Sequence, residues 1–340
     1  MMTRKRNWLV AIVILLAFAL PMFAGSESEA AAPAPAVRAA KEFHIALILK
    51  SLSNPAIWNI ADAAEKQGAK MGVRVTVLSS MGFSALNDQI KQVEDMIQRR
   101  VDLIGLQPVD SKGVIPVIQD ANRAGIPVIT VDTGADGGKV VTYIATDNYA
   151  AGKQAGEWIT RMIEGKGKVA MIEGTPGSMQ GRQRMEGFHE YIKAQRGINL
   201  AVSIPGHFER AKGMQVMEDI LTAHPDLKAV FCANDEMALG ALEALKQRNL
   251  VGKVILLGMN GSWDALDATA KGLMQGTVVQ YSRLHGTEFI QVAVQYLNGT
   301  RKVWPEYMPL PTFVADTLMF NRLAEDMESI PSYRAPKIKP

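Results

Sequence analysis

The sequence predicts an α/β protein built from two doubly wound parallel-sheet lobes. Short apolar runs rich in β-branched residues alternate with longer segments of helical periodicity. This alternation starts again after residue 144 and continues through the second half of the chain. Strands and helices that alternate at this spacing form parallel sheets with helices on both faces. We therefore expect two such sheets in succession.

The first unit contains a helical pattern over residues 87–99, where Ile90, Val93, Met96 and Ile97 recur at helical spacing. Its other elements follow from the same comparison of strand and helix periods. The strands are expected over residues 43–49, 73–78, 103–106, 127–131 and 143–144, and the helices over 55–70, 87–99 and 114–124.

The second unit repeats the rhythm of the first. Its strands are expected over residues 168–172, 200–204, 229–232 and 254–257, and its helices over 150–164, 180–194, 212–223 and 236–246. Doubly wound sheets bind ligands at the carboxyl ends of their strands. The loops that follow the strands are therefore the place to look for functional residues.

Polar side chains follow the predicted strands at one strand end after another. Any single Asn or Asp in such a position could simply cap the next helix or form a turn. Their recurrence favours a polar cleft at the carboxyl ends of the sheets. These residues are Lys50, Asn54, Gln107, Asp110, Asp132, Asn234, Asp235, Asn260 and Gln280.

The chemistry of such a cleft suits a polyhydroxylated solute. A sugar ring carries hydroxyls that donate and accept, and apolar C–H faces that lie against aromatic rings. Trp58 and Phe208 are candidates for the stacking surface, and ordinary core packing is the alternative for each. The candidates for reading hydroxyls are Asp132, Arg182, Asn234, Asn260 and Gln280.

No residue pattern indicates catalysis or metal binding. The five histidines have no paired spacing suited to a metal, and neither a Walker-type loop nor a G-x-S-x-G elbow occurs. We therefore expect no enzymatic activity, no metal and no cofactor. The single cysteine, Cys232, lies in an apolar run and is expected to be a buried hydrophobe rather than a reactive thiol.

The N-terminus has the pattern of a secretory signal peptide over residues 1–24. Three basic residues precede an apolar run of about 13 residues, shorter than the roughly 20 that cross a bilayer. A small-residue cleavage site follows near Ala24, and an uncleaved anchor is the alternative. Residues 25–42 have too little large apolar surface to fold and predict a flexible linker. We expect an exported, periplasmic protein.

The formal charge of +3 is contributed by the signal segment. Removing its three basic residues from the 37 Lys and Arg leaves 34, which equals the number of Asp and Glu. Proteins that bind nucleic acid need a surplus of cations to displace counterions from phosphates. Nucleic acid is therefore not an expected partner.

Several motifs resemble those of the ribose-type periplasmic binding proteins. Residues 208–213, 221–226 and 234–241 read FERAKG, LTAHPD and NDEMALGA. The resemblance covers roughly residues 43–310, and it extends to the segments 53–55 (SNP), 127–132 (PVITVD), 146–148 (TDN), 182–188 (RQRMEGF) and 258–261 (GMNG).

The resemblance implies a type I periplasmic binding protein with a three-segment hinge that closes over its ligand. Its crossovers are expected near Thr146, Gln280 and Leu310. The lobes would then be residues 43–146 with 281–310 and residues 147–280 with 311–325, followed by a tail, 326–340. A monomer that delivers a sugar to the membrane permease of an ABC transporter is the implied role. The contacts carried over by motif are Asn54, Asp132, Arg182, Phe208, Asn234 and Gln280.

The chain departs from the ribose binders at four places in the site. Lys50 stands where they carry Ser, Thr133 where they carry Arg, and Asn260 where they carry Asp. Two Phe are replaced by residues 56–57, and Trp58 comes next. We therefore expect a ligand other than ribose held in the usual way. One hypothesis is that Lys50 faces the cleft and reads an acceptor on the solute; the alternative is a solvated lysine at the rim.

Two other classes compete with transport. The same closed form could be sensed by a chemoreceptor or a sensor kinase, which the residues do not distinguish from delivery to a permease. Sugar-responsive transcription regulators resemble the same fold but begin with a DNA-binding helix-turn-helix, where this chain has a signal and a linker.

Overall fold

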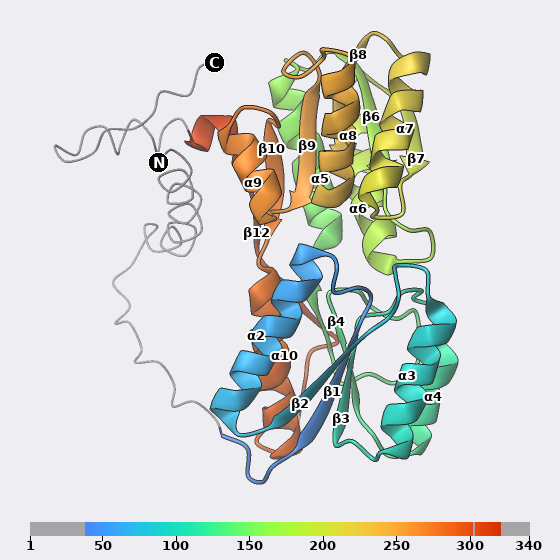
Figure 1. Ribbon diagram of the computed structural model, residues 1–340, viewed down its shortest axis with the longest axis vertical. Helices are drawn as coiled ribbons and strands as arrows, with labels where there is room; N and C mark the ends of the chain where they lie inside the picture. Colours follow the sequence, from blue (N-terminus) through green and yellow to red (C-terminus); the bar gives the residue numbers. More distant parts are fainter. Residues whose placement is uncertain (1–37, 302, 321–340) are drawn as a thin grey trace, which may run out of the picture.

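Two lobes stacked along the long axis of the molecule make up the computed structural model (Figure 1). The structure describes residues 38–301 and 303–320. The predicted signal peptide and its cleavage site near Ala24, the predicted linker up to residue 37 and the predicted tail 326–340 lie outside these residues. Each lobe contains one sheet flanked by helices, so the predicted fold class is confirmed.

The first lobe contains a six-stranded parallel sheet in the spatial order β11-β5-β4-β3-β1-β2. Helices α2 and α10 pack together, as do α3 and α4 (Figure 1). The elements are β1 (His44–Leu49), α2 (Pro55–Met71), β2 (Arg74–Ser79), α3 (Leu86–Gln98), β3 (Leu103–Leu106), α4 (Ile115–Arg123), β4 (Val128–Val131), β5 (Tyr143–Thr146), α10 (Ser282–Leu297) and β11 (Tyr307–Leu310).

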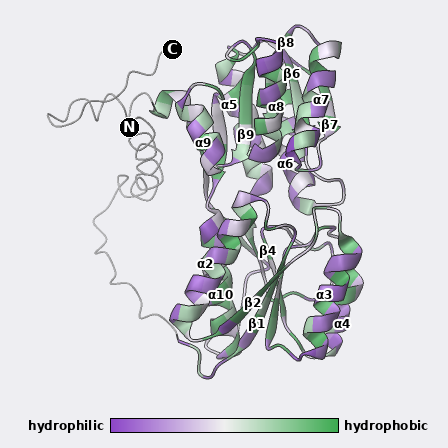
Figure 2. Ribbon diagram, viewed as in Figure 1, coloured by the Kyte–Doolittle hydropathy of each residue, from purple (hydrophilic) through white to green (hydrophobic). Residues whose placement is uncertain are grey.

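Strand β1 has apolar side chains on both faces of the sheet, so helices must cover both faces. Leu47 and Leu49 lie in the core cluster that contains residues of α2 and α10. Ala46 and Ile48 point the other way, into the cluster that contains residues of α3 and α4. Because neighbouring side chains of a strand face opposite sides, a strand covered on both faces is a continuous apolar run. The hydropathy colouring shows the same contrast between apolar strands and mixed helices (Figure 2).

The second lobe contains a six-stranded sheet in the spatial order β12-β10-β9-β8-β6-β7. All its neighbouring strands are parallel except β12, which is antiparallel to β10. The elements are α5 (Asn148–Met162), β6 (Gly167–Glu173), α6 (Met179–Lys193), β7 (Ile198–Pro205), α7 (Arg210–Ala223), β8 (Leu227–Cys232), α8 (Asp235–Gln247), β9 (Ile255–Asn260), α9 (Trp263–Ala270), β10 (Gly276–Gln280) and β12 (Thr312–Asp316).

The chain passes between the two sheets three times. Strand β5 ends at Thr146 in the first sheet, and α5 then packs against strands of the second. Strand β10 ends at Gln280 in the second sheet, and α10 returns to pack against α2. Only Pro311 separates β11 of the first sheet from β12 of the second. The carboxyl ends of β5 and β10 therefore lie beside passages between the lobes.

The packed part of the chain begins slightly before the predicted first strand. The backbone of Ala39 donates to the carbonyl of Met71, and Ala40 donates to the side chain of Asn298. Residues 38–40, which the sequence places in a flexible linker, are thus held against α2 and the end of α10. None of the described helices is long and apolar enough to cross a membrane.

Candidate functional site

A cavity lies between the lobes, and both sheets contribute side chains to its wall. Most polar members follow the end of a strand or lie at the start of a helix, as the strand-end pattern predicts, and Arg184 lies in the second turn of α6. The lining residues are Asn54, Ala56, Ile57, Ile60, Phe83, Gln107, Asp132, Gln180, Arg184, Phe208, Asn234, Asn260 and Gln280.

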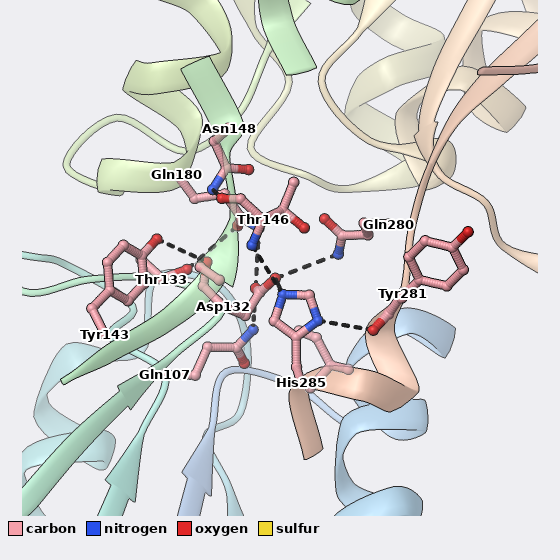
Figure 3. Close-up of polar contacts among 12 residues, drawn as sticks. Gln107, Asp132, Thr133, Tyr143, Thr146, Asn148, Gln180, Gln280, Tyr281 and His285 are labelled. Carbon is pink, nitrogen blue, oxygen red and sulfur yellow. Dashed lines mark hydrogen bonds and ion pairs between the residues drawn. The ribbon is translucent and has the colours of Figure 1, made fainter. Parts of the chain in front are cut away.

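Asp132 is the acceptor on which the amide side chains of both lobes converge (Figure 3). Its Oδ2 accepts hydrogen bonds from Gln107 Nε2 at 2.7 Å and Gln180 Nε2 at 3.0 Å. Its Oδ1 accepts from Gln280 Nε2 at 3.4 Å. The residue is buried and has a φ of 61°. Such a backbone conformation is strained for a residue with a side chain and is often found at functional sites.

Arg184 is the buried cation of the cavity, and the sequence analysis missed it. Its guanidinium donates to Asn148 Oδ1 at 2.9 Å, to the carbonyl of Ala233 at 2.6 Å and to Gln280 Oε1 at 2.9 Å. Burial lowers the pKa of Arg184 to about 10, and the charge of Asp132 opposes that shift. Arg184 therefore stays charged at neutral pH, held by neutral acceptors.

Arg182, the arginine chosen from the sequence, does not line the cavity. Its Nη2 donates to both carboxylate oxygens of Asp136 at 2.8 Å, and its Nη1 donates to the carbonyl of Gly177. About a third of its side chain is exposed. Two positions along an α-helix turn a side chain by roughly 200°. Arg182 and Arg184 therefore face different sides of α6, and the structure places Arg184 rather than Arg182 in the cavity wall.

Lys50 is buried rather than solvated, so the rim alternative does not hold. Only 1% of the residue is exposed. Its Nζ donates to Thr133 Oγ1 at 2.7 Å and to Ser178 Oγ at 3.4 Å, and it lies 5.8 Å from the ring centre of Phe208. Burial lowers the pKa of Lys50 to about 8, with Asp132 opposing the shift. Ser178 belongs to the second lobe, so Lys50 joins the two lobes.

Phe208 supplies an aromatic wall of the cavity. It is buried and lies 5.7 Å from the ring of Phe83, a cavity residue that the sequence analysis did not identify. Gly174 is needed for this arrangement, because a Cβ at that position would lie 2.1 Å from Phe208 Cζ. Trp58, the other predicted stacking residue, is 52% exposed and is not in the wall of the cavity.

The predicted asparagines cap helices and line the cavity at the same time. Asn54 accepts from the first backbone amides of α2, and Asn234 accepts from the amide of Met237 in α8. Asn234 also donates to the carbonyl of Phe208 at 3.0 Å, which fixes that residue. The side chain of Asn260 accepts from the backbone of Asp235. Asn54 and Asn234 therefore cap helices and also lie in the cavity wall, so the two explanations are compatible.

Two predicted cleft carboxylates lie outside the cavity wall and support loops instead. Asp110 accepts from the backbone amides of residues 112 and 113 at the start of α4. Asp235 accepts from the backbone of Ser262 and the hydroxyl of Thr277, both at 2.6 Å. Burial raises the pKa of Asp235 to about 6.

The described residues contain no group of three or more His, Cys, Asp or Glu side chains that could hold a metal ion. Cys232 is fully buried, and burial raises its pKa. This agrees with the expectation of a buried hydrophobe, since a reactive cysteine needs exposure and a stable thiolate.

Two α/β lobes joined by three passages, with a polar cavity between them, define a ligand-binding protein of the two-lobed type. The chain belongs to the family described as the periplasmic binding protein domain, whose model matches residues 45–301. The predicted membership of the type I, ribose-binding-protein-like group is thereby confirmed.

Characterised relatives and solved structures support the assignment. The chain is 37% identical to the ribose import binding protein of Bacillus subtilis over 77% of its own length and 84% of the relative's. It is 31% identical to the D-allose-binding periplasmic protein of Escherichia coli, covering 69% and 78% of the two chains. These relatives are binding proteins rather than enzymes, in agreement with the prediction of no catalytic activity.

Among solved structures, an ABC transporter periplasmic solute-binding protein of Actinobacillus succinogenes with bound D-allose is 30% identical. It matches with a TM-score of 0.78 over 83% of this chain and 100% of that one. A solute-binding protein of Bacillus halodurans with bound myo-inositol matches with a TM-score of 0.77 at 26% identity, over 83% and 97% of the chains.

Proposed function

We propose that the chain is the periplasmic solute-binding component of an ABC-type carbohydrate importer. Its ligand is a monosaccharide or a related polyol or sugar derivative, enclosed between the lobes. The observation that carries this proposal is the convergence of Asp132 and Arg184, with amide side chains and an aromatic ring, on one cavity between the sheets. Groups that donate and groups that accept, next to an apolar wall, suit a ring of hydroxyls.

Binding works by closure of the lobes around the hinge. A ligand stabilises the closed state only by the contacts that it gains there and lacks in the open state. Gln107 and Asp132 belong to the first lobe, whereas Arg184 and Phe208 belong to the second. A solute that contacts both sets is held only when the lobes are together, which supports a hinge mechanism.

The ligand is one that suits Lys50, Thr133 and Asn260, and it is not ribose held in the usual mode. An ammonium group has three N–H donors, and the hydroxyls of Thr133 and Ser178 account for two of them. Lys50 is not among the residues that line the cavity, so its remaining donor reaches a carbonyl, carboxylate or hydroxyl of the solute only when the side chain turns toward Phe208, whose ring centre lies 5.8 Å away. Hydrogen bonds that involve a charged group are stronger than neutral ones, so this contact contributes to specificity.

A thermal-shift screen of the exported chain over pentoses, hexoses, polyols and sugar acids tests the proposal. A ligand that binds only the folded state raises the melting temperature by mass action. We expect at least one monosaccharide-sized compound to give a saturable rise. No shift from any member of the panel would count against a carbohydrate ligand.

Delivery to a permease is tested by uptake of the radiolabelled ligand in cells with and without the gene. The names of the relatives, which refer to import and to ABC transporters, support this role. Loss of uptake on deletion is the expected result. Unchanged uptake together with a lost behavioural or transcriptional response to the ligand would favour the sensing role instead.

A further inference from the structure

His285 is a fully buried histidine at the base of two of the passages between the lobes. It lies in the first turn of α10 (Figure 3). The backbone N–H of Thr146, at the end of β5, donates to its Nε2 at 3.2 Å. Its Nδ1 lies 3.1 Å from the carbonyl of Tyr281, which can only accept. The ring is therefore neutral, with its proton on Nδ1 and its acceptor nitrogen on Thr146.

Thr146 is held from both sides of the passage. His285 binds its N–H from the first lobe, and Asn148 Nδ2, at the start of α5, donates to its carbonyl at 3.0 Å. Asn148 Oδ1 in turn accepts from Arg184. The backbone at the end of β5 is thus tied to the buried guanidinium of the candidate ligand site.

Further contacts link Arg184 through Gln280 to Asp132, which lies beside His285. Arg184 donates to Gln280 Oε1 at 2.9 Å, and Gln280 Nε2 donates to Asp132 Oδ1 at 3.4 Å. Asp132 Oδ1 lies 3.8 Å from His285 Nε2. In the neutral ring both atoms are acceptors, so no hydrogen bond joins Asp132 Oδ1 to His285 Nε2.

We propose that His285 is a positioning residue that couples the ligand-site carboxylate to the hinge. In its neutral form it holds the N–H of Thr146 and leaves Asp132 Oδ1 to accept from Gln280 and from the ligand. With a second proton, Nε2 becomes a donor, releases Thr146 and turns its hydrogen bond to Asp132. The part of this proposal that concerns Asp132 rests on the proposed function, because it takes Asp132 as an acceptor for the ligand.

Two charged groups face His285. Asp132 favours the protonated ring, and Arg184 opposes it. Burial is the largest influence and lowers the pKa of His285 below its ordinary value of 6.5, so the ring is neutral at neutral pH. The unfolded chain takes up the proton first as the pH falls below 6.5, so the folded state loses stability between that pH and the pKa of buried His285.

Hydrogen exchange at the Thr146 amide in the free protein tests the coupling without a ligand. Nuclear magnetic resonance would follow its protection factor from about pH 8 down to the acid limit of the folded state, because burial lowers the pKa of His285 below 6.5. We expect protection to fall roughly tenfold or more on acidification, since a buried hydrogen bond is lost. Three variants separate the causes. His285→Gln offers an acceptor without a titrating ring, His285→Leu offers neither, and Asp235→Asn removes another buried carboxyl, whose pKa is about 6.

In His285→Gln the Thr146 amide should stay protected across this range, and in Asp235→Asn it should respond to pH as in the natural chain. His285→Leu should be unprotected throughout, if it folds. A pH response that survives in His285→Gln, or protection that does not change with pH in the natural chain, would overturn the proposal. Neither result depends on finding a ligand, so the coupling can fail while the proposed function stands.

Discussion

Lys50 donates to Thr133 across 2.7 Å, and these are two of the positions at which the resemblance to the ribose binders implies a departure. The hydroxyl of Thr133 in turn donates to Gln180 Oε1, and Gln180 donates to Asp132. An arginine at position 133 would place a second cation beside the buried ammonium, at a high electrostatic cost. The two implied departures therefore fit one another, because a buried lysine at position 50 disfavours an arginine at position 133.

This fit predicts non-additive behaviour of the two positions. Thr133→Arg alone should destabilise the protein by a few kcal/mol, because two buried like charges meet. Lys50→Ser with Thr133→Arg should recover about 0.5–3 kcal/mol of that loss, the usual range for residues in contact. Urea unfolding of the single and double variants measures the coupling. Additive effects would mean that the two side chains do not interact in solution.

Lys50 also predicts how stability changes at alkaline pH. Its pKa is about 8 in the folded state and 10.5 in the unfolded chain. Between these values the unfolded chain binds more protons, so stability rises with pH. Below pH 8 both states are protonated, and burial of the charge costs on the order of 3 kcal/mol. Lys50→Met should remove this rise and should be more stable than the natural chain at neutral pH.

Unfolding curves at several alkaline pH values compare the natural chain with Lys50→Met. Their difference isolates Lys50 from the other groups that titrate in this range. An equal slope in the two proteins would indicate that the lysine is solvated.

Arg184 and Arg182 form a matched pair on one helix. Arg184→Met should lower ligand affinity by at least about a hundredfold, because it removes a buried donor and leaves three acceptors without their partner. Arg182→Met removes a partly exposed ion pair, and we expect a change in affinity of less than about fivefold. Calorimetric titration with the compound found in the thermal-shift screen measures both. A larger loss in Arg182→Met would restore the sequence-based choice.

The two predicted aromatic contacts give a second matched pair. Phe208→Ala should cost about 3–5 kcal/mol of stability and weaken ligand binding, since it opens the buried wall of the cavity. Trp58→Ala should change stability by about 0.5 kcal/mol or less, because half of the side chain is exposed. Thermal unfolding with and without ligand distinguishes them. A strong loss of binding in Trp58→Ala would contradict the assignment of the wall to Phe208.

The strand and helix rhythm was predictable because buried parallel strands are uninterrupted apolar runs. Strand Leu103–Leu106 has the bounds expected from the sequence, and most helix ends differ by one or two residues. No strand or helix was expected after residue 257, where α9, β10, α10, β11 and β12 occur. Strand β12 pairs antiparallel with β10, which the repeating parallel pattern does not anticipate.

Helical spacing could have found Arg184 and rejected Trp58. Gln180, Arg184 and Phe188 are spaced four apart and lie on the buried face of α6, whereas Arg182 does not share that spacing. In α2 the buried face contains Ile57, Ile60 and Ala64, and Trp58 lies off it. Arg182 was carried over by motif order and Trp58 was chosen for its aromatic ring, and neither choice took the buried face of its helix into account.

His285 could not have been found from the sequence. Its role depends on Thr146 and Asp132, which lie 139 and more than 150 positions away along the chain. Only the return of α10 to the first lobe brings them together. Phe83 is similar, because its place in the cavity depends on contact with Phe208 across the lobes.

Calorimetric titration of the natural chain and of Asp132→Asn tests the central claim most directly. The substitution keeps the shape of the side chain but removes the charge that Gln107, Gln180 and Gln280 surround. We predict one binding site for a monosaccharide-sized ligand in the natural chain and an affinity at least about a hundredfold lower in Asp132→Asn, the effect of losing charge-assisted hydrogen bonds. An unchanged affinity in Asp132→Asn would contradict the claim that the solute is held between the lobes at Asp132.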